Sequence, residues 1–298
     1  MQTRYRAAAT ALLLTATAGM AAIGGAAEAS GTHHAGAGAA KTLTITVKSK
    51  AGHVLTVSDN KFRPGNTIFK LRNMDGKASR GLIQLLRFRH GYTLADAKTD
   101  IDAAFGGDPA AVKRVDDGIV FYGGARAKGS PSRVVQWAVK LDKAATYYLV
   151  NFNQHHSALA TMTVTGDKQD RALPQRTGFI NAVTSSNASG NDFVAGKDGT
   201  AKGWMSTRNE AEEPHFVEVR QVKKGTTDSD ISAMFTGGPD PSIKHGAHAD
   251  TGVISPGHRF LWSYRLTAGR YAALCFWPSI DDGMPHAIMG MHTVFNLH

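Results

Sequence analysis

The last 30 residues of the chain, 269–298, hold the side chains best suited to bind a metal ion. They include the only cysteine of the sequence, Cys275, followed by His286 and then by Met291. A thiolate, two imidazoles and a weak thioether form the ligand set of a blue-copper site. This order of ligand types therefore predicts a soft-metal site near the end of the chain.

The second imidazole is expected from His215, which lies in the alternating segment 213–219. Alternation places His215 on the same face as Val217 and Val219, so its ring would point into an apolar interior. A buried histidine needs a polar partner, which can be a metal ion or a backbone carbonyl. Taken alone, His215 fits either interpretation; beside the candidate ligands of the last segment, the metal-ligand interpretation gains.

The elements that must position these ligands are predicted to be β-strands. Residues 270–276 alternate and carry Cys275, and residues 292–297 form a final alternating run. A turn-rich loop that contains Pro278, Asp281 and Gly283 lies between them. The cysteine, one histidine and the methionine would then lie at the ends of two neighbouring strands.

The chain repeats the same order of elements. Residues 82–88 predict a strand followed by a helix with capping spacing at Thr93 and Asp96, and residues 216–222 predict a strand followed by a helix near Thr227. Self-similarity at a period of roughly 130 residues indicates an internal duplication. Under this alignment Cys275 falls opposite Asn151, so the first half lacks most of the candidate ligands.

The arrangement resembles the cupredoxin (plastocyanin/azurin-like) family, in which an early histidine is followed by Cys, His and Met at the last two strands. The His-x4-Met spacing of His286 and Met291, followed by a closing strand, matches that family. The resemblance implies an all-β chain of two tandem Greek-key cupredoxin-like β-sandwiches, each with a short inserted helix. It also implies one mononuclear copper, with His215, Cys275 and His286 as equatorial ligands and Met291 as the axial ligand. One departure is the gap of ten residues between Cys275 and His286, which is only a few residues in small blue-copper proteins.

The first 29 residues predict a cleavable export signal. Arg4 and Arg6 precede an apolar stretch, and Ala27-Glu28-Ala29 fits a cleavage site, so we expect a secreted protein. We expect a flexible tether at 30–41, a cupredoxin-like domain that lacks most ligands at 42–166, a linker at 167–175 and a domain with the candidate copper site at 176–298. No later stretch predicts a membrane span.

Composition and motifs argue against several functions. The formal net charge is +10, but the basic residues are scattered, which disfavours nucleic-acid binding. Enzyme signatures such as G-x-S-x-G, a Walker loop or H-E-x-x-H do not occur. Cys275 is flanked by Leu274 and Phe276 rather than by histidines, which disfavours a multicopper oxidase. We therefore expect no enzyme, and we expect His245 and His248, in a Gly-containing segment, to lie in a solvated loop.

These observations predict an exported copper protein that transfers single electrons to or from an unidentified partner protein. Two alternatives stay open. The Met/His-rich segment with Met284, His286, Met289, Met291 and His292 would suit an extracellular copper carrier or scavenger. The chain would instead be a metal-free interaction module if Cys275 and His215 were only buried structural residues. The sequence predicts no oligomeric state.

Overall fold

The computed structural model describes residues 38–48, 54–74, 82–89, 91–126, 134–151, 158–169, 171–196 and 198–298. The predicted export signal at 1–29 and most of the predicted tether lie outside the described residues. No helix among the described residues is long and apolar enough to cross a membrane.

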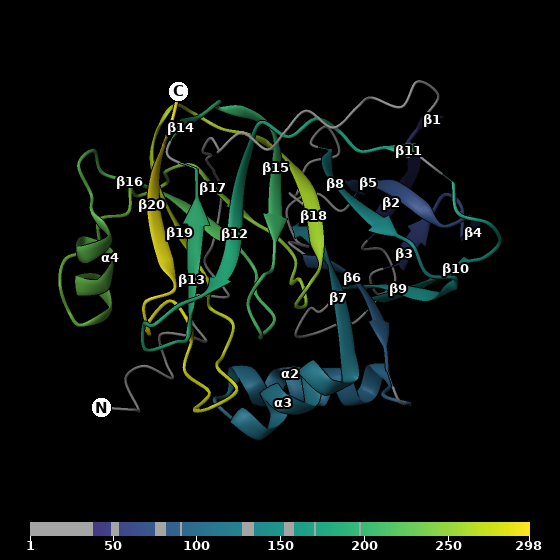
Figure 1. The fold of residues 1–298 in the computed structure, drawn as a ribbon, viewed down its shortest axis with the longest axis horizontal. Helices are drawn as coiled ribbons and strands as arrows, with labels where there is room; N and C mark the ends of the chain where they lie inside the picture. Colours follow the sequence, from purple (N-terminus) through teal and green to yellow (C-terminus); the bar gives the residue numbers. More distant parts are fainter. Residues whose placement is uncertain are drawn as a thin grey trace.

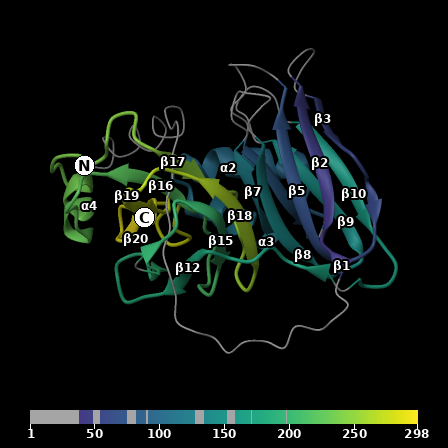
Figure 2. The same cartoon turned by 90° about the horizontal axis from the view of Figure 1, so that it is seen from above.

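The first half of the chain forms two sheets that enclose a common core (Figures 1 and 2). One consists of β2 (Lys41–Lys48), β3 (Val54–Val57), β5 (Gly65–Asn73) and β8 (Val135–Leu141). The other consists of β4 (Lys61–Phe62), β6 (Leu82–Phe88), β7 (Ile119–Arg126), β9 (Ala145–Asn151) and β10 (Ala158–Val164). In β2 the buried side chains of Leu43, Ile45 and Val47 alternate with partly exposed ones.

The second half repeats the same architecture. Its first sheet consists of β12 (Gly178–Thr184), β13 (Asn191–Ala195), β15 (Lys202–Arg208) and β18 (Arg259–Arg265). Its second sheet consists of β14 (Asp198–Gly199), β16 (Glu218–Val222), β17 (His248–Asp250), β19 (Gly269–Leu274) and β20 (His292–Leu297).

The strand orders of the two halves correspond element by element. The order β3-β2-β5-β8 is matched by β13-β12-β15-β18, and β4-β10-β9-β6-β7 is matched by β14-β20-β19-β16-β17. The predicted all-β class and the internal repeat are therefore confirmed. β8 and β18 pair with each other, with Leu261 opposite Ala138, so the two halves share one eight-stranded sheet.

The inserted helices differ between the halves. The predicted helix α2 (Leu94–Phe105) begins at a capping box of Thr93 and Asp96, and α4 (Asp228–Phe235) of the second half begins at the same motif. The prediction of one helix per half is wrong for the first half, where α3 (Pro109–Gly118) follows directly. Asp108 caps this helix and Pro109 occupies its first turn, so the glycines after α2 form a turn between two helices.

Two short strands fall in segments that the sequence predicted to be irregular. β1 (Gly38–Ala39) pairs in parallel with β11 (Arg171–Ala172). The end of the predicted tether is therefore hydrogen-bonded to the middle of the predicted linker. Gly38 and Ala39 therefore lie in β1 and Lys41 begins β2, although the sequence predicted a tether there. The domain boundaries themselves stay predictions.

The buried side chain of Gln84 joins the two halves. Its amide nitrogen donates to the carbonyls of Gly123 on β7 (2.9 Å) and Val253 of the second half (3.0 Å), and its amide oxygen accepts from the N–H of Val253 (2.7 Å). Residues 251–254 thereby lie along β7, with bridges from Tyr122 to Ile254 and from Ala125 to Thr251. The interface is thus built from backbone hydrogen bonds as well as apolar packing.

Replacing Gln84 should show how far the halves depend on this junction. Gln84→Leu removes the side-chain partner of the Gly123 carbonyl and of the Val253 N–H in a buried setting, where each unpaired group costs about 1–3 kcal/mol. The carbonyl of Val253 keeps its bond from the N–H of Gly123 (2.8 Å). We expect the free energy of unfolding to fall by about 3 kcal/mol or more in urea denaturation. Gln136→Leu, at a half-buried position of β8, is the control and should cost less than about 1 kcal/mol. Equal losses in the two variants would contradict this role of Gln84.

Candidate metal centre

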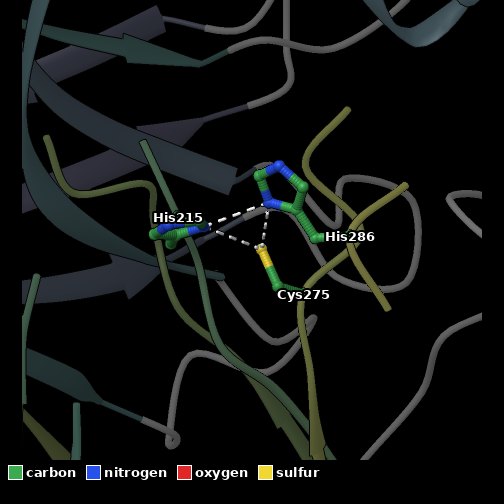
Figure 3. A group of neighbouring side chains, drawn as sticks. All are labelled: His215, Cys275 and His286. Carbon is green, nitrogen blue, oxygen red and sulfur yellow. Dashed lines mark hydrogen bonds between the residues drawn. The ribbon is translucent and has the colours of Figure 1, made fainter. Parts of the chain in front are cut away.

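Three predicted ligands converge in the interior of the second half (Figure 3). The sulfur of Cys275 lies 3.6 Å from Nδ1 of His215 and 3.9 Å from Nδ1 of His286, and the two Nδ1 atoms are 3.1 Å apart. The three residues are almost completely buried, with exposed fractions of 0%, 1% and 0% for Cys275, His215 and His286. The structure therefore brings together side chains that are up to 71 residues apart in the sequence.

His215 is held by the segment that also contacts the first half. It lies just before β16, and its backbone N–H donates to the carbonyl of Ile254 (3.1 Å) while its carbonyl accepts from the N–H of Ile254 (2.8 Å). Val217 and Val219 are buried with it, as the alternation predicted. Because Ile254 also bridges to Tyr122 of β7, the backbone of the first half supports this ligand.

The other three candidate ligands are linked by backbone hydrogen bonds. Cys275 directly follows β19, and its N–H donates to the carbonyl of Met291 (3.4 Å). The N–H of Met291 donates to the carbonyl of His286 (2.9 Å), and the N–H of Ala287 donates to the carbonyl of Cys275 (2.6 Å). Met291 is fully buried in the same core cluster as Cys275. These bonds place the backbone of Met291 next to both neighbouring ligands.

The long segment between Cys275 and His286 is closed at its base. The N–H of His286 donates to the carbonyl of Trp277 (3.0 Å), and Pro278 and Pro285 form a bridge one step further out. The N–H of Ser279 then donates to the carbonyl of Met284 (2.8 Å). We call residues 277–286 the ligand hairpin. Because the hairpin begins and ends at one place, its length does not separate Cys275 from His286.

The ligand hairpin packs against the helices of the first half. Trp277 contacts Phe105 of α2 and Phe121 of β7 edge to face, each with ring centroids 5.7 Å apart. Ile280 packs against a small buried cluster from α2 and α3. Gly283 lies so close to the turn between these helices that an added Cβ would be 2.6 Å from the carbonyl oxygen of Gly107. The helix pair thus supports the loop that carries a predicted ligand.

Charge distinguishes the two histidines. Burial and the nearby His286 ring together lower the pKa of His215 well below its usual value. Burial alone would also lower the pKa of His286, but Cys275 and the carboxylate of Glu213 outweigh it and raise the pKa to about 9. Oε2 of Glu213 lies 3.3 Å from Nε2 of His286, although the two are not aligned as a hydrogen bond. Glu213 was not predicted from the sequence to be part of the site.

The three donors fit a single metal ion. Two atoms that bind one metal at about 2.0–2.3 Å each lie within about 4.5 Å of one another, and all three distances here meet that limit. Two imidazole nitrogens 3.1 Å apart repel each other through their lone pairs unless a proton or a cation lies between them. Two imidazoles and a thiolate are the donor set that selects copper in a mononuclear site.

A second group of possible ligands consists of Glu218, His248 and Asp250. The prediction that His248 lies in a solvated loop is wrong, because β17 pairs with β16 and buries it, whereas His245 is exposed. Arginines already neutralise the two carboxylates, since Arg126 is bonded to Asp250 and Arg220 to Glu218. This group is therefore an ion-pair network, and Arg126 of β7 makes it another link between the halves.

The Met/His-rich segment does not act as one unit. His292 lies at the start of β20 and its Nε2 is 3.0 Å from the hydroxyl of Ser232 on α4, while its Nδ1 is 3.5 Å from Asp228. Its ring is thus engaged by α4, away from the three converging donors. Met284 and Met289 are half-buried, in contrast to the fully buried Met291.

Several solved structures of copper proteins are similar to this chain. Auracyanin A, a "blue" copper protein from Chloroflexus aurantiacus, is 16% identical over 42% of this chain and 99% of its own length, with a TM-score of 0.30. The Cu-containing nitrite reductase from Thermus scotoductus is 11% identical over 87% of this chain and 62% of its own (TM-score 0.25). The copper nitrite reductase from Nitrosomonas europaea is 12% identical over 87% and 94% (TM-score 0.25).

No protein-family model matches the chain, and no curated protein matches it. The TM-scores of these structures are low, so nothing about the metal site of this chain is inferred from them. The cupredoxin-like, all-β fold is inferred instead from the repeated strand order and from the position of Cys275, His286 and Met291 beside the last two strands.

The contact between the ligand hairpin and the helix pair can be tested with two glycines of similar backbone conformation. Gly283 and Gly257 have φ angles of +72° and +74°, but an added Cβ meets the Gly107 carbonyl only at Gly283. Both Gly→Ala variants incur the conformational cost of about 1–2 kcal/mol. We expect Gly283→Ala to lose about 1–3 kcal/mol more, because backbone must move. Equal thermal midpoints for the two variants would rule out the tight contact.

The ion-pair network should govern part of the stability at acid pH. Burial alone would raise the pKa of Asp250, but Arg126 and His248 outweigh it and lower the pKa to about 2. A lowered pKa contributes stability above the unfolded value near 4 and loses it as the pH falls toward 2. Burial raises the pKa of Glu218, which is opposite in direction to the shift of Asp250, so the loss of stability in acid is assigned to Asp250.

We expect the wild type to lose about 2 kcal/mol more than Asp250→Asn between pH 4 and pH 2. Urea denaturation at a series of pH values measures this difference. Asp167→Asn, at an exposed position, is the control and should follow the wild-type profile. A profile of Asp250→Asn parallel to that of the wild type would contradict the assignment.

Proposed function

We propose that this protein is exported and carries single electrons on one mononuclear copper ion held by His215, Cys275, His286 and Met291. The observation that carries the proposal is the convergence of two Nδ1 atoms and one sulfur within 3.1–3.9 Å in a buried site. A redox partner protein, which we do not identify, would supply or accept the electron. Copper provides the change of oxidation state, and the chain provides a fixed set of donors.

The way in which the ligands are held supports electron transfer. A copper site transfers electrons readily when the donors need not move between Cu(I) and Cu(II). Here the backbone hydrogen bonds among Cys275, His286 and Met291 fix three ligands to each other, and Ile254 fixes the fourth, His215. Such a network opposes rearrangement of the donors when the charge of the metal changes.

A second observation supports an electron carrier rather than an enzyme. In the described part of the chain, the other group of three possible ligands is the network of Glu218, His248 and Asp250, whose carboxylates are paired with arginines. A site that converts a substrate at copper would need a coordination position open to that substrate, whereas His215, Cys275 and His286 are almost completely buried. His292 contacts Ser232 of α4, which argues against a copper carrier or scavenger that uses the Met/His-rich segment.

The visible and electron-paramagnetic-resonance spectra of the Cu(II)-loaded protein test this function. We expect an intense blue thiolate-to-copper band that is lost in Cys275→Ser, because the thiolate is the donor responsible for it. Met291→Leu, which keeps the volume of the side chain but removes the thioether, should keep the band and change its position. Thermal denaturation of the metal-free variants checks that they are folded.

Two outcomes would overturn the proposal. Copper binding without the blue band, and unchanged in Cys275→Ser, would favour a copper carrier. No binding of Cu(I) or Cu(II) by the folded wild type would favour a metal-free interaction module.

A further inference from the structure

Glu213 lies beside the candidate copper ligands without being one of them. It precedes Pro214 and His215 in the sequence, and its side chain is only 12% exposed. The carboxylate meets three groups, two from the ligand hairpin and one from β13. Its Oε2 accepts from the N–H of Ile280 (2.9 Å) and lies 3.3 Å from Nε2 of His286, and its Oε1 accepts from the side-chain amide of Asn191 (3.3 Å).

These contacts connect the two sides of the site. Ile280 belongs to the ligand hairpin, and His286 ends that hairpin, so one carboxylate oxygen touches both its outer part and its ligand. The backbone of Glu213 is continuous with His215, the ligand on the opposite side. Glu213 thus links the segment that carries His215 to the ligand hairpin that ends at His286.

The carboxylate is itself held in place. The backbone carbonyl of Glu213 accepts from the side-chain amide of Asn209 (2.7 Å), and the following proline favours an extended conformation at Glu213. Asn191 is fixed in turn, because its side-chain amide also donates to the carbonyl of Ser189 (2.7 Å). Burial alone would raise the pKa of Glu213, but its contacts with His286, Ile280 and Asn191 outweigh burial and lower it.

We propose that Glu213 is a positioning residue of the copper centre, which fixes the ring of His286 and holds the ligand hairpin closed over Cys275. Only the copper-binding test of this inference rests on the proposed function. A carboxylate next to the remote nitrogen of a ligand histidine orients the ring and makes it a stronger donor. In this chain the same carboxylate also binds the hairpin, which explains how ten intervening residues leave His286 in register with Cys275.

The first experiment compares Glu213→Gln with Glu218→Gln. Both remove a buried carboxylate of the second half while keeping its shape, but Glu218 pairs with Arg220 and lies in the ion-pair network. We expect Glu213→Gln to weaken Cu(II) binding by about 10- to 100-fold in competition with a chelator, the usual effect of losing such a partner. Glu218→Gln should bind copper as the wild type does, and Glu213→Asp should recover part of the affinity.

The second experiment needs no copper. The thiol of Cys275 is fully buried, so an alkylating reagent reaches it only when the site opens. In the metal-free protein we expect Glu213→Ala to be alkylated about tenfold faster or more, because a charged hydrogen-bond partner of the hairpin is lost. Glu218→Gln should be alkylated at the wild-type rate, and circular dichroism should show that both variants are folded.

The two readouts separate the inference from the proposed function. Faster alkylation of Glu213→Ala in a protein that binds no copper would leave the positioning role intact and overturn the copper function. Wild-type copper affinity in Glu213→Gln together with wild-type alkylation in Glu213→Ala would overturn the inference. Equal acceleration in Glu218→Gln would also overturn it, because the effect would then be a general loss of stability.

Discussion

The candidate site depends on holding three metal-binding atoms together in a place that water does not reach. Two imidazole nitrogens 3.1 Å apart and a sulfur within 3.9 Å of both are unfavourable neighbours without a shared proton or cation. A shared proton or cation favours this geometry, and the chain around the three residues also constrains it. The backbone bonds of Ile254 to His215, of Met291 to Cys275 and of Ala287 to Cys275 supply that constraint from three directions.

The first half takes part in this constraint although it lacks the ligand set. Its strand β7 pairs with residues 251–254, which in turn hold His215, and its helices α2 and α3 support the ligand hairpin through Phe105 and Gly107. The eight-stranded sheet and the side chain of Gln84 then fix the two halves relative to each other. A half without ligands thus contributes to the shape of the site.

Local sequence features were sufficient to predict the all-β class, the repeat and the helices α2 and α4, because alternation and capping spacing are visible over a few residues. The convergence of His215 with Cys275 and His286 was predicted from the order of ligand types along residues 215–291 and from the family resemblance. The missed features depend on distant contacts. Glu213 is important through partners 22 and 67 residues away, and His248 is buried because β17 pairs with β16 in spite of its Gly-containing surroundings.

The repeat also separates what the fold needs from what the site needs. Asn151 ends β9 at the position that matches Cys275, and it is fully buried with both atoms of its side-chain amide unpaired among the described residues. Such a group lowers stability, yet the first half keeps the same strand order as the second. The same strand order thus surrounds Asn151 in one half and Cys275 in the other. The strand order alone therefore does not call for a cysteine at this position, and the cluster of Cys275, His215 and His286 is a feature of the second half.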